Sequence, residues 1–204
     1  MEALLAFGAA LVSLRLAADL VRRWRERRAS ELAAWSASLA AYAAASGALA
    51  WGAAAGWDGR VFRIYYLGGG LLTAALLGIG SLLRAGRRWA WPAGLLYTGL
   101  SLGVALAVPL TAPVGGDSIP EAQAHLDVFP ARALAWLGNG LGTLAVVAVA
   151  LATIRRRPLG NALLLAGVAV AAAGSTVAGL GAAESAVFVA AAAGLLYGGF
   201  VTSR

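Results

Sequence analysis

The residues best suited to chemistry gather in a polar segment, 112–131, between two long apolar stretches. It contains the one histidine of the chain, His125, with carboxylates nearby at Glu121 and Asp127. On a helix, Glu121 and His125 would lie one turn apart on the same face. Such residues hold a divalent cation or act as a general acid and base. The alternative is an amphipathic helix, begun by a capping box at Ser118 and Glu121, that rests on a membrane surface.

A second candidate is a polar pair, Arg15 and Asp19, which lie four residues apart inside an apolar stretch. Ionisable residues within a membrane are costly and often mark a functional pathway. The structural alternative is that Asp19 bonds Arg15 at this helical spacing, while the long arginine side chain extends to the headgroups. Both interpretations stay open at this stage.

The third candidate is a small-molecule site at the run 62–70, FRIYYLGGG. Arg63 can bind a carboxylate or a phosphate, and two phenols, Tyr65 and Tyr66, flank it. Asp58 is the fourth candidate ligand-binding residue. Three successive glycines allow a local break in the helix, as in transporters that expose backbone to a substrate. The alternative is an aromatic belt in which Arg63 pairs with Asp58 and the glycines permit close packing. We expect the ligand-binding residues, if any, to be here.

The elements that position these residues are apolar runs of membrane length. The chain of 204 residues is 61% hydrophobic and 12% charged, with 27 glycines and no cysteine. A soluble domain has about 25% charged residues, so a soluble or a disordered protein is excluded. The absence of cysteine excludes disulfides and thiolate metal sites. The net charge is +7, and all the cations are arginines that cluster mainly in short loops, so we expect contacts with membrane lipids and no nucleic acid.

Seven transmembrane helices are predicted, forming an all-α bundle that comprises one domain, 1–204. At about 1.5 Å per residue, each can cross a hydrocarbon core of about 30 Å. If Arg15 and Asp19 fall outside the membrane, the first becomes an interfacial helix and the number drops to six. The predicted spans are 3–21, 32–55, 62–83, 90–111, 132–153, 159–180 and 185–202, with the outer loop at 112–131.

Arginine placement predicts the orientation. The connections after the first, third and fifth spans are arginine-rich and share one side, which the positive-inside rule makes cytoplasmic. The N-terminus is therefore expected outside and the C-terminus inside, in a multi-pass protein of a bacterial plasma membrane. The first span carries its cations after the apolar stretch, so we interpret it as a retained signal anchor. The arginines concerned are Arg22, Arg23, Arg25, Arg27, Arg28, Arg84, Arg87, Arg88, Arg155, Arg156 and Arg157.

Small residues recur at four-residue spacing within the spans and predict faces where helices approach closely. With seven helices to pack, packing inside the chain is favoured over dimerisation. The stripes are Gly70, Ala74 and Gly78; Gly99 and Gly103; Gly138 and Gly142; Gly194 and Gly198.

The sequence lacks the residues that several known activities of membrane proteins require. No lysine is present for a retinal Schiff base, and one histidine cannot supply a zinc hydrolase or a haem. Asp19 is the only acid within a predicted span, which disfavours a proton-coupled pump. We therefore expect no cofactor, and a non-enzymatic role is favoured.

Four short runs resemble a group of uncharacterised seven-span membrane proteins of high-GC bacteria. They are Arg63-Ile64-Tyr65-Tyr66-Leu67-Gly68, Leu77-Gly78-Ile79-Gly80-Ser81, Pro130-Ala131-Arg132 and Gly160-Asn161. The resemblance implies a membrane location and no activity.

Three functions remain open. The leading hypothesis is a protein that binds or passes a small amphipathic or anionic molecule in an outward-facing pocket near Arg63. The structural alternative is an accessory subunit or scaffold that docks onto another membrane protein through its small-residue stripes. The enzymatic alternative is lipid modification at the outer surface by His125 and nearby acids.

Overall fold

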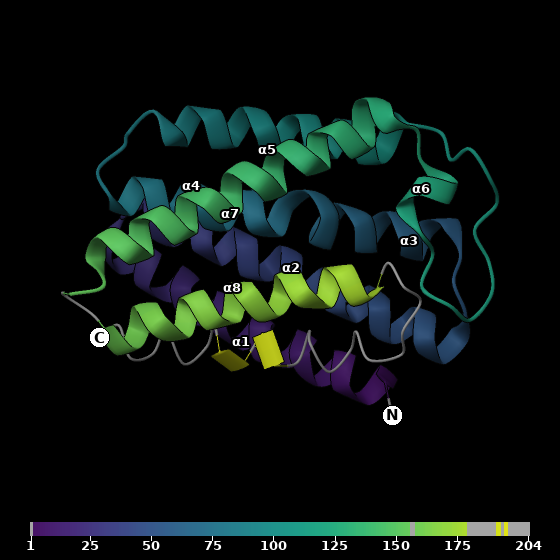
Figure 1. The fold of residues 1–204 in the computed structure, drawn as a ribbon, viewed down its shortest axis with the longest axis horizontal. Helices are drawn as coiled ribbons and strands as arrows, with labels where there is room; N and C mark the ends of the chain where they lie inside the picture. Colours follow the sequence, from purple (N-terminus) through teal and green to yellow (C-terminus); the bar gives the residue numbers. More distant parts are fainter. Residues whose placement is uncertain (1, 156–157, 179–190, 193, 196–204) are drawn as a thin grey trace.

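The computed structural model describes residues 2–155, 158–178, 191–192 and 194–195. Its long elements are helices that run roughly parallel to one long axis (Figure 1). Five helical stretches are long and apolar enough to cross a membrane in the described part of the chain. They comprise α1 (Glu2–Arg27), α2 (Ser30–Ala55), the continuous α3 (Gly59–Tyr65), η1 (Tyr66–Leu72) and α4 (Thr73–Arg84), α5 (Ala90–Ala107), and η2 (Val128–Arg132) with α7 (Ala133–Thr153).

The structure therefore has all-helical architecture among the described residues, and its first five long apolar stretches match the first five predicted spans. The sixth predicted span, 159–180, coincides with α8 (Pro158–Ala178). The seventh, 185–202, lies outside the described residues apart from 191–192 and 194–195. Large apolar side chains face outward on many helices, for example Leu106 at 82% and Leu4 at 74% exposure. Outward-facing leucines at this density are typical of helices surrounded by lipid.

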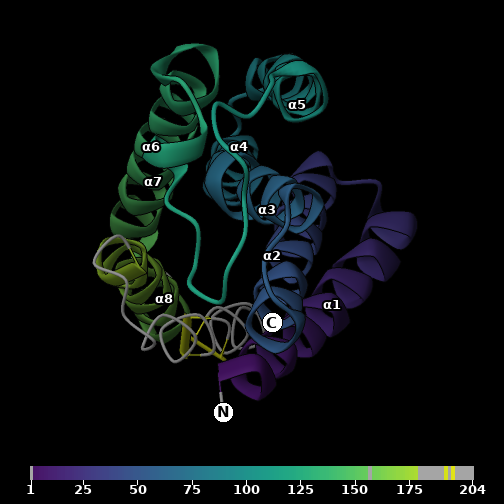
Figure 2. The same ribbon diagram turned by 90° about the vertical axis from the view of Figure 1, so that its right-hand side faces the viewer.

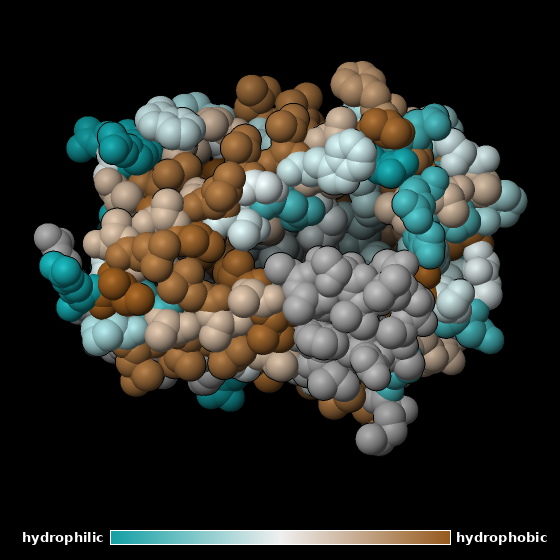
Figure 3. All heavy atoms as spheres, in the orientation of Figure 1, coloured by the Kyte–Doolittle hydropathy of each residue, from teal (hydrophilic) through white to brown (hydrophobic). Residues whose placement is uncertain are grey.

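Hydrophilic residues gather at the two ends of the molecule, with an apolar band between them (Figure 3). The connections α1–α2, α4–α5 and α7–α8 lie at one end, and the short helix α6 (Ala122–His125) lies at the other (Figure 1). Arginines are concentrated in the first group of connections. The separation of the arginine-rich loops from the outer loop thus follows the predicted alternation of the spans.

The centre of the bundle is built on α2, which packs against α1, α3, η1 and α4. On its other side α4 packs against α7, and α7 continues to α8. The view along the helices shows α1 and α5 at the periphery (Figure 2). One core cluster lies toward the arginine-rich end and a second lies beneath the outer loop, where it includes Phe62, Trp57 and Leu126.

Two helix ends differ from the predicted boundaries, for local reasons. The predicted span ends at residue 21, where the apolar stretch ends, whereas α1 continues through the arginine-rich turn to Arg27. α5 ends at Ala107 rather than at 111. Pro109 disfavours the helical conformation for the residue before it, and Val108 is extended at φ −73° and ψ 123°.

Candidate functional site

The predicted partner of Arg63, Asp58, is used to begin α3. Its Oδ1 atom accepts hydrogen bonds from the backbone N–H groups of Arg60 at 2.7 Å and Val61 at 2.8 Å. This is the ordinary N-cap arrangement, which satisfies donors that have no partner inside the helix. The Asp58–Arg63 ion pair of the alternative interpretation is absent among the described residues. The Asp58 carboxylate is instead bonded to the first turn of α3, and the Arg63 side chain extends to α5.

Arg63 reaches across to the neighbouring helix instead. Its Nη1 atom donates to the backbone oxygen of Ala105 at 2.6 Å, in the last turn of α5. The carbonyls of a last helical turn are unsatisfied and carry partial negative charge, so a guanidinium is stabilised there. Arg63 is half-buried, and it makes no ion pair with any described acid. Four of its five N–H donors have no protein partner in the described part of the chain.

The two phenols lie in an aromatic cluster under the outer loop. Tyr65 packs edge-on against Trp57 with 5.3 Å between ring centroids. Tyr66 stacks on Phe62 at 5.9 Å, and its hydroxyl donates to the backbone oxygen of Ala131 at 3.3 Å. The structure thus brings Arg63, Tyr65 and Tyr66 to the outer end of one helix, and both phenols contact neighbouring segments.

The outer loop folds back and closes on itself over this cluster. The backbone N–H of Thr111 donates to the His125 oxygen at 3.0 Å, and that of Trp57 donates to the Gly116 oxygen at 2.9 Å. Phe62 is 1% exposed and meets the His125 ring edge-on at 5.6 Å. The loop therefore forms an ordered cover across the outer helix ends (Figure 2).

The predicted metal ligands do not converge. Glu121 precedes α6, which has only four residues, and its Oε2 accepts from the amide of Gln123 at 2.7 Å. The Nδ1 atom of His125 lies 3.3 Å from the oxygen of Ala112, and Asp127 is exposed. No group of three or more potential ligands is found among the described residues. The expected shared face for Glu121 and His125 is wrong, because the helix begins after Glu121 rather than at Ser118.

The structure also corrects the predicted bond between Arg15 and Asp19. Asp19 accepts from Nη2 of Arg22 at 3.1 Å, and Arg15 is exposed without an ion pair among the described residues. Side chains on a helix lean toward its N-terminus. Arg22 therefore leans back toward Asp19, whereas Arg15 leans away from it.

The most polar part of the bundle interior is a π-helical segment, η1, where the three glycines lie. The wider turn frees backbone carbonyls, and side chains satisfy them. Asn139 of α7 donates to the Gly70 oxygen at 2.9 Å, and Tyr97 of α5 donates to the Leu71 oxygen at 2.9 Å. Ser38 of α2 donates to the Thr73 oxygen at 2.7 Å. The Thr73 hydroxyl in turn donates to the Gly68 oxygen, also at 2.7 Å.

Sequence reasoning identified the glycine run as a place where the helix can break locally. It did not identify Ser38 or the shared target of the four side chains. The signal was the coincidence of three glycines with single polar residues at similar depth in other spans. π-turns of this kind are frequent at functional sites.

Comparison with protein-family models, with curated proteins and with solved structures finds no match for this chain. A function must therefore be argued from the geometry of the site itself.

Proposed function

We propose that this is a multi-pass plasma-membrane protein that binds a small anionic or amphipathic molecule at the outer end of α3. The proposal includes the seven-span arrangement, with the N-terminus outside and the C-terminus in the cytoplasm. Arg63 supplies the contact to the anion. The half-buried rings of Tyr65 and Tyr66 supply the adjoining apolar surface.

The observation that carries the proposal is the state of Arg63. It is half-buried at the outer end of a membrane-length helix, and no described acid neutralises it. Its hydrogen bond to the Ala105 oxygen fixes its position and leaves donors for a ligand. A preorganised guanidinium favours a carboxylate or a phosphate, because two parallel N–H groups match two oxygens. Low dielectric on the protein side strengthens that attraction.

The test is native mass spectrometry of the protein extracted gently from its own membranes. We expect a bound small molecule of defined mass that is lost in Arg63→Ala and retained in Arg60→Ala. Arg60 is the matched control, since it lies on the same helix, is exposed, and bonds Asp58 through its backbone N–H rather than its side chain. An Arg63→Ala protein that keeps the same bound mass would overturn the proposal.

One observation favours a second function, that of an accessory subunit. The outward face of α5 carries Leu96 at 67% and Leu100 at 51% exposure, and a methyl group added at Gly99 or Gly103 would meet nothing within 4 Å. Small residues on an open apolar face let another helix approach closely. This function requires a co-purifying membrane protein that is lost in the Gly99→Leu/Gly103→Leu variant. A partner-free wild-type preparation would contradict it.

A further inference from the structure

The connection between α4 and α5, at the arginine-rich end of the molecule, carries positive charge that no ion pair balances. The Nη1 atom of Arg84, where α4 ends, lies 3.8 Å from Oε1 of Glu31 on α2. Arg87 and Arg88, which follow in the connection, are exposed and have no ion pair in the described part of the chain. The sequence contains no acid at positions 59–116. Two positive charges are therefore uncompensated at this surface.

Backbone hydrogen bonds hold the two arginines in place. Gly86 has φ +82°, the left-handed conformation that commonly ends a helix. The N–H of Arg87 donates to the Leu82 oxygen at 2.9 Å, which closes the turn on α4. The Arg88 oxygen accepts from the N–H of Trp91 at 3.2 Å, which joins the turn to α5. The connection is therefore built from backbone bonds, and the two guanidinium groups remain available to a ligand.

Below the arginines, α5 presents an exposed apolar row. Trp91, Leu95 and Leu102 are 39%, 58% and 43% exposed. At about 100° per residue they lie within about 40° of one another around the helix, and about 16 Å separates the first from the last. One leaflet of the hydrocarbon core is about 15 Å deep, and tryptophan is enriched at its edge. No charged residue interrupts the row, because none occurs at positions 89–107.

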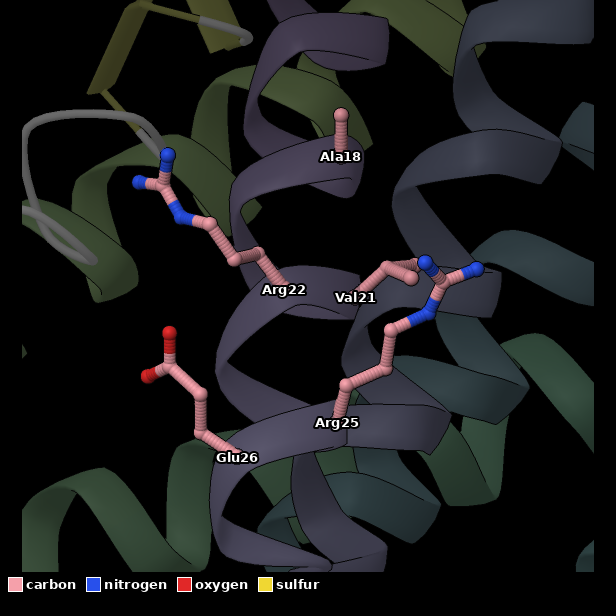
Figure 4. A pocket seen from close by; sticks show the side chains of 5 residues that line it. All are labelled: Ala18, Val21, Arg22, Arg25 and Glu26. Atoms are coloured by element: carbon pink, nitrogen blue, oxygen red, sulfur yellow. The ribbon is translucent and has the colours of Figure 1, made fainter.

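The same end of α1 differs in both respects. Figure 4 shows Arg22 and Arg25 on this helix, where they line a surface hollow together with Glu26. Asp19 accepts from Nη2 of Arg22 at 3.1 Å. Two acids thus balance two arginines, and the exposed Arg15 interrupts the apolar stretch that precedes them. Of the two connections, the one between α4 and α5 joins uncompensated cations to an uninterrupted apolar row.

We propose that the α4–α5 connection binds the headgroup of an anionic phospholipid. Arg87 and Arg88 contact the phosphate, because guanidinium N–H groups match phosphate oxygens in pairs. The indole of Trp91 lies at the level of the glycerol esters, and an acyl chain follows Leu95 and Leu102. Two uncompensated cations favour a lipid with net negative charge over a zwitterionic one, whose headgroup brings a cation of its own. The indole and the leucines favour a lipid over free phosphate, which makes no apolar contact.

The test is native mass spectrometry with phosphatidylglycerol and phosphatidylethanolamine of identical acyl chains in equal amounts. We expect wild type to retain phosphatidylglycerol preferentially. Arg87→Gln/Arg88→Gln should lose about 25-fold of that retention, at about fivefold per arginine. The matched control is Arg22→Gln/Arg25→Gln, which removes two exposed arginines from the same end of the molecule. That control should retain the lipid as wild type does, because acids already balance its arginines.

Three outcomes would overturn the proposal. They are equal retention of the two lipids by wild type, an equal loss in the control variant, and displacement of the lipid by millimolar inorganic phosphate, which would indicate a site for free anions. The double variant removes no backbone bond of the connection, so we expect it to fold. If it does not fold, Arg88→Gln alone replaces it with an expected loss of about fivefold, and unchanged retention would be equally decisive against the proposal.

Discussion

Two neighbouring spans, α3–η1–α4 and α5, carry similar sequence patterns and have opposite surroundings. Both contain small residues at four-residue spacing, Gly70 to Gly78 in one and Gly99 to Gly103 in the other. In the first, a methyl group added at Gly78 would lie 2.9 Å from the carbonyl carbon of Gly142 on α7. In the second, the same addition meets nothing. Spacing thus identifies a face that permits close approach, while the neighbours decide whether the bundle uses it.

Their polar residues differ in the same way. Thr98 on α5 bonds the Gly94 oxygen of its own helix at 2.8 Å. The carbonyls of η1 instead receive side chains from α5 and α7, and the carbonyl of Thr73, the first residue of α4, receives Ser38 from α2. In a membrane, a bond within one helix contributes little to assembly, whereas bonds between helices fix their relative positions. The interior span is therefore positioned by polar contacts with three other helices, whereas the polar contacts of α5 with other helices are made by Tyr97 and by the Ala105 carbonyl.

The largest expected effect comes from filling the close contact between α4 and α7. Gly78→Leu should destabilise the fold by about 3 kcal/mol, because the two backbones must separate to accommodate the side chain. We expect loss of the monodisperse species in size-exclusion chromatography and a lower melting temperature in detergent. The matched variant Gly99→Leu should leave both unchanged. Equal behaviour of the two variants would remove the distinction between the spans.

A smaller effect is expected where a side chain satisfies η1. Asn139→Ala leaves the Gly70 carbonyl without its partner, and should lower the unfolding free energy by about 1–2 kcal/mol. Thr98→Val, which removes a bond within α5, is the control and should change it by less than about 0.5 kcal/mol. Denaturation followed by circular dichroism measures both. A Thr98→Val loss as large as that of Asn139→Ala would show that the bonds between helices have no special weight.

The smallest effect should follow removal of a single hydroxyl. Ser38→Ala removes the donor to the Thr73 oxygen, and we expect a loss of about 0.6 kcal/mol. A cycle with Asn139→Ala sharpens the comparison, because both residues act on the same helical segment. Coupling energy of about 0.5 kcal/mol or more would show that the η1 contacts act together. Strict additivity would show that each carbonyl is satisfied independently.

Much of the fold follows from hydropathy, since a run of about 20 apolar residues has few other solutions. The second and third spans were predicted at 32–55 and 62–83, and the structure has Ser30–Ala55 and Gly59–Arg84. The end of α5 required the local effect of Pro109 on Val108. The number of spans and the orientation stay predictions.

The site was less predictable, because side-chain partners depend on the packing of other helices. The pairing of Arg63 with Asp58 was reasonable from proximity in sequence. It was wrong because Asp58 caps its own helix and Ala105 lies 42 positions further along the chain from Arg63. Similarly, nothing local to Ser38 indicates that it bonds Thr73. The glycine run indicates the position of the π-turn. The side chains that bond its carbonyls can be identified only from the fold.

The π-turn also sets the rotational phase of everything that follows it. A wide turn accommodates one residue beyond what an α-helix would need, and each residue of an α-helix advances the chain by about 100°. Deleting Gly69 and restoring regular α geometry would rotate α4 by about that angle relative to α3. Gly78 would then face away from Gly142, although no residue of the α4–α7 contact had been altered. Within this span, the length of the glycine run therefore determines which side of α4 meets α7.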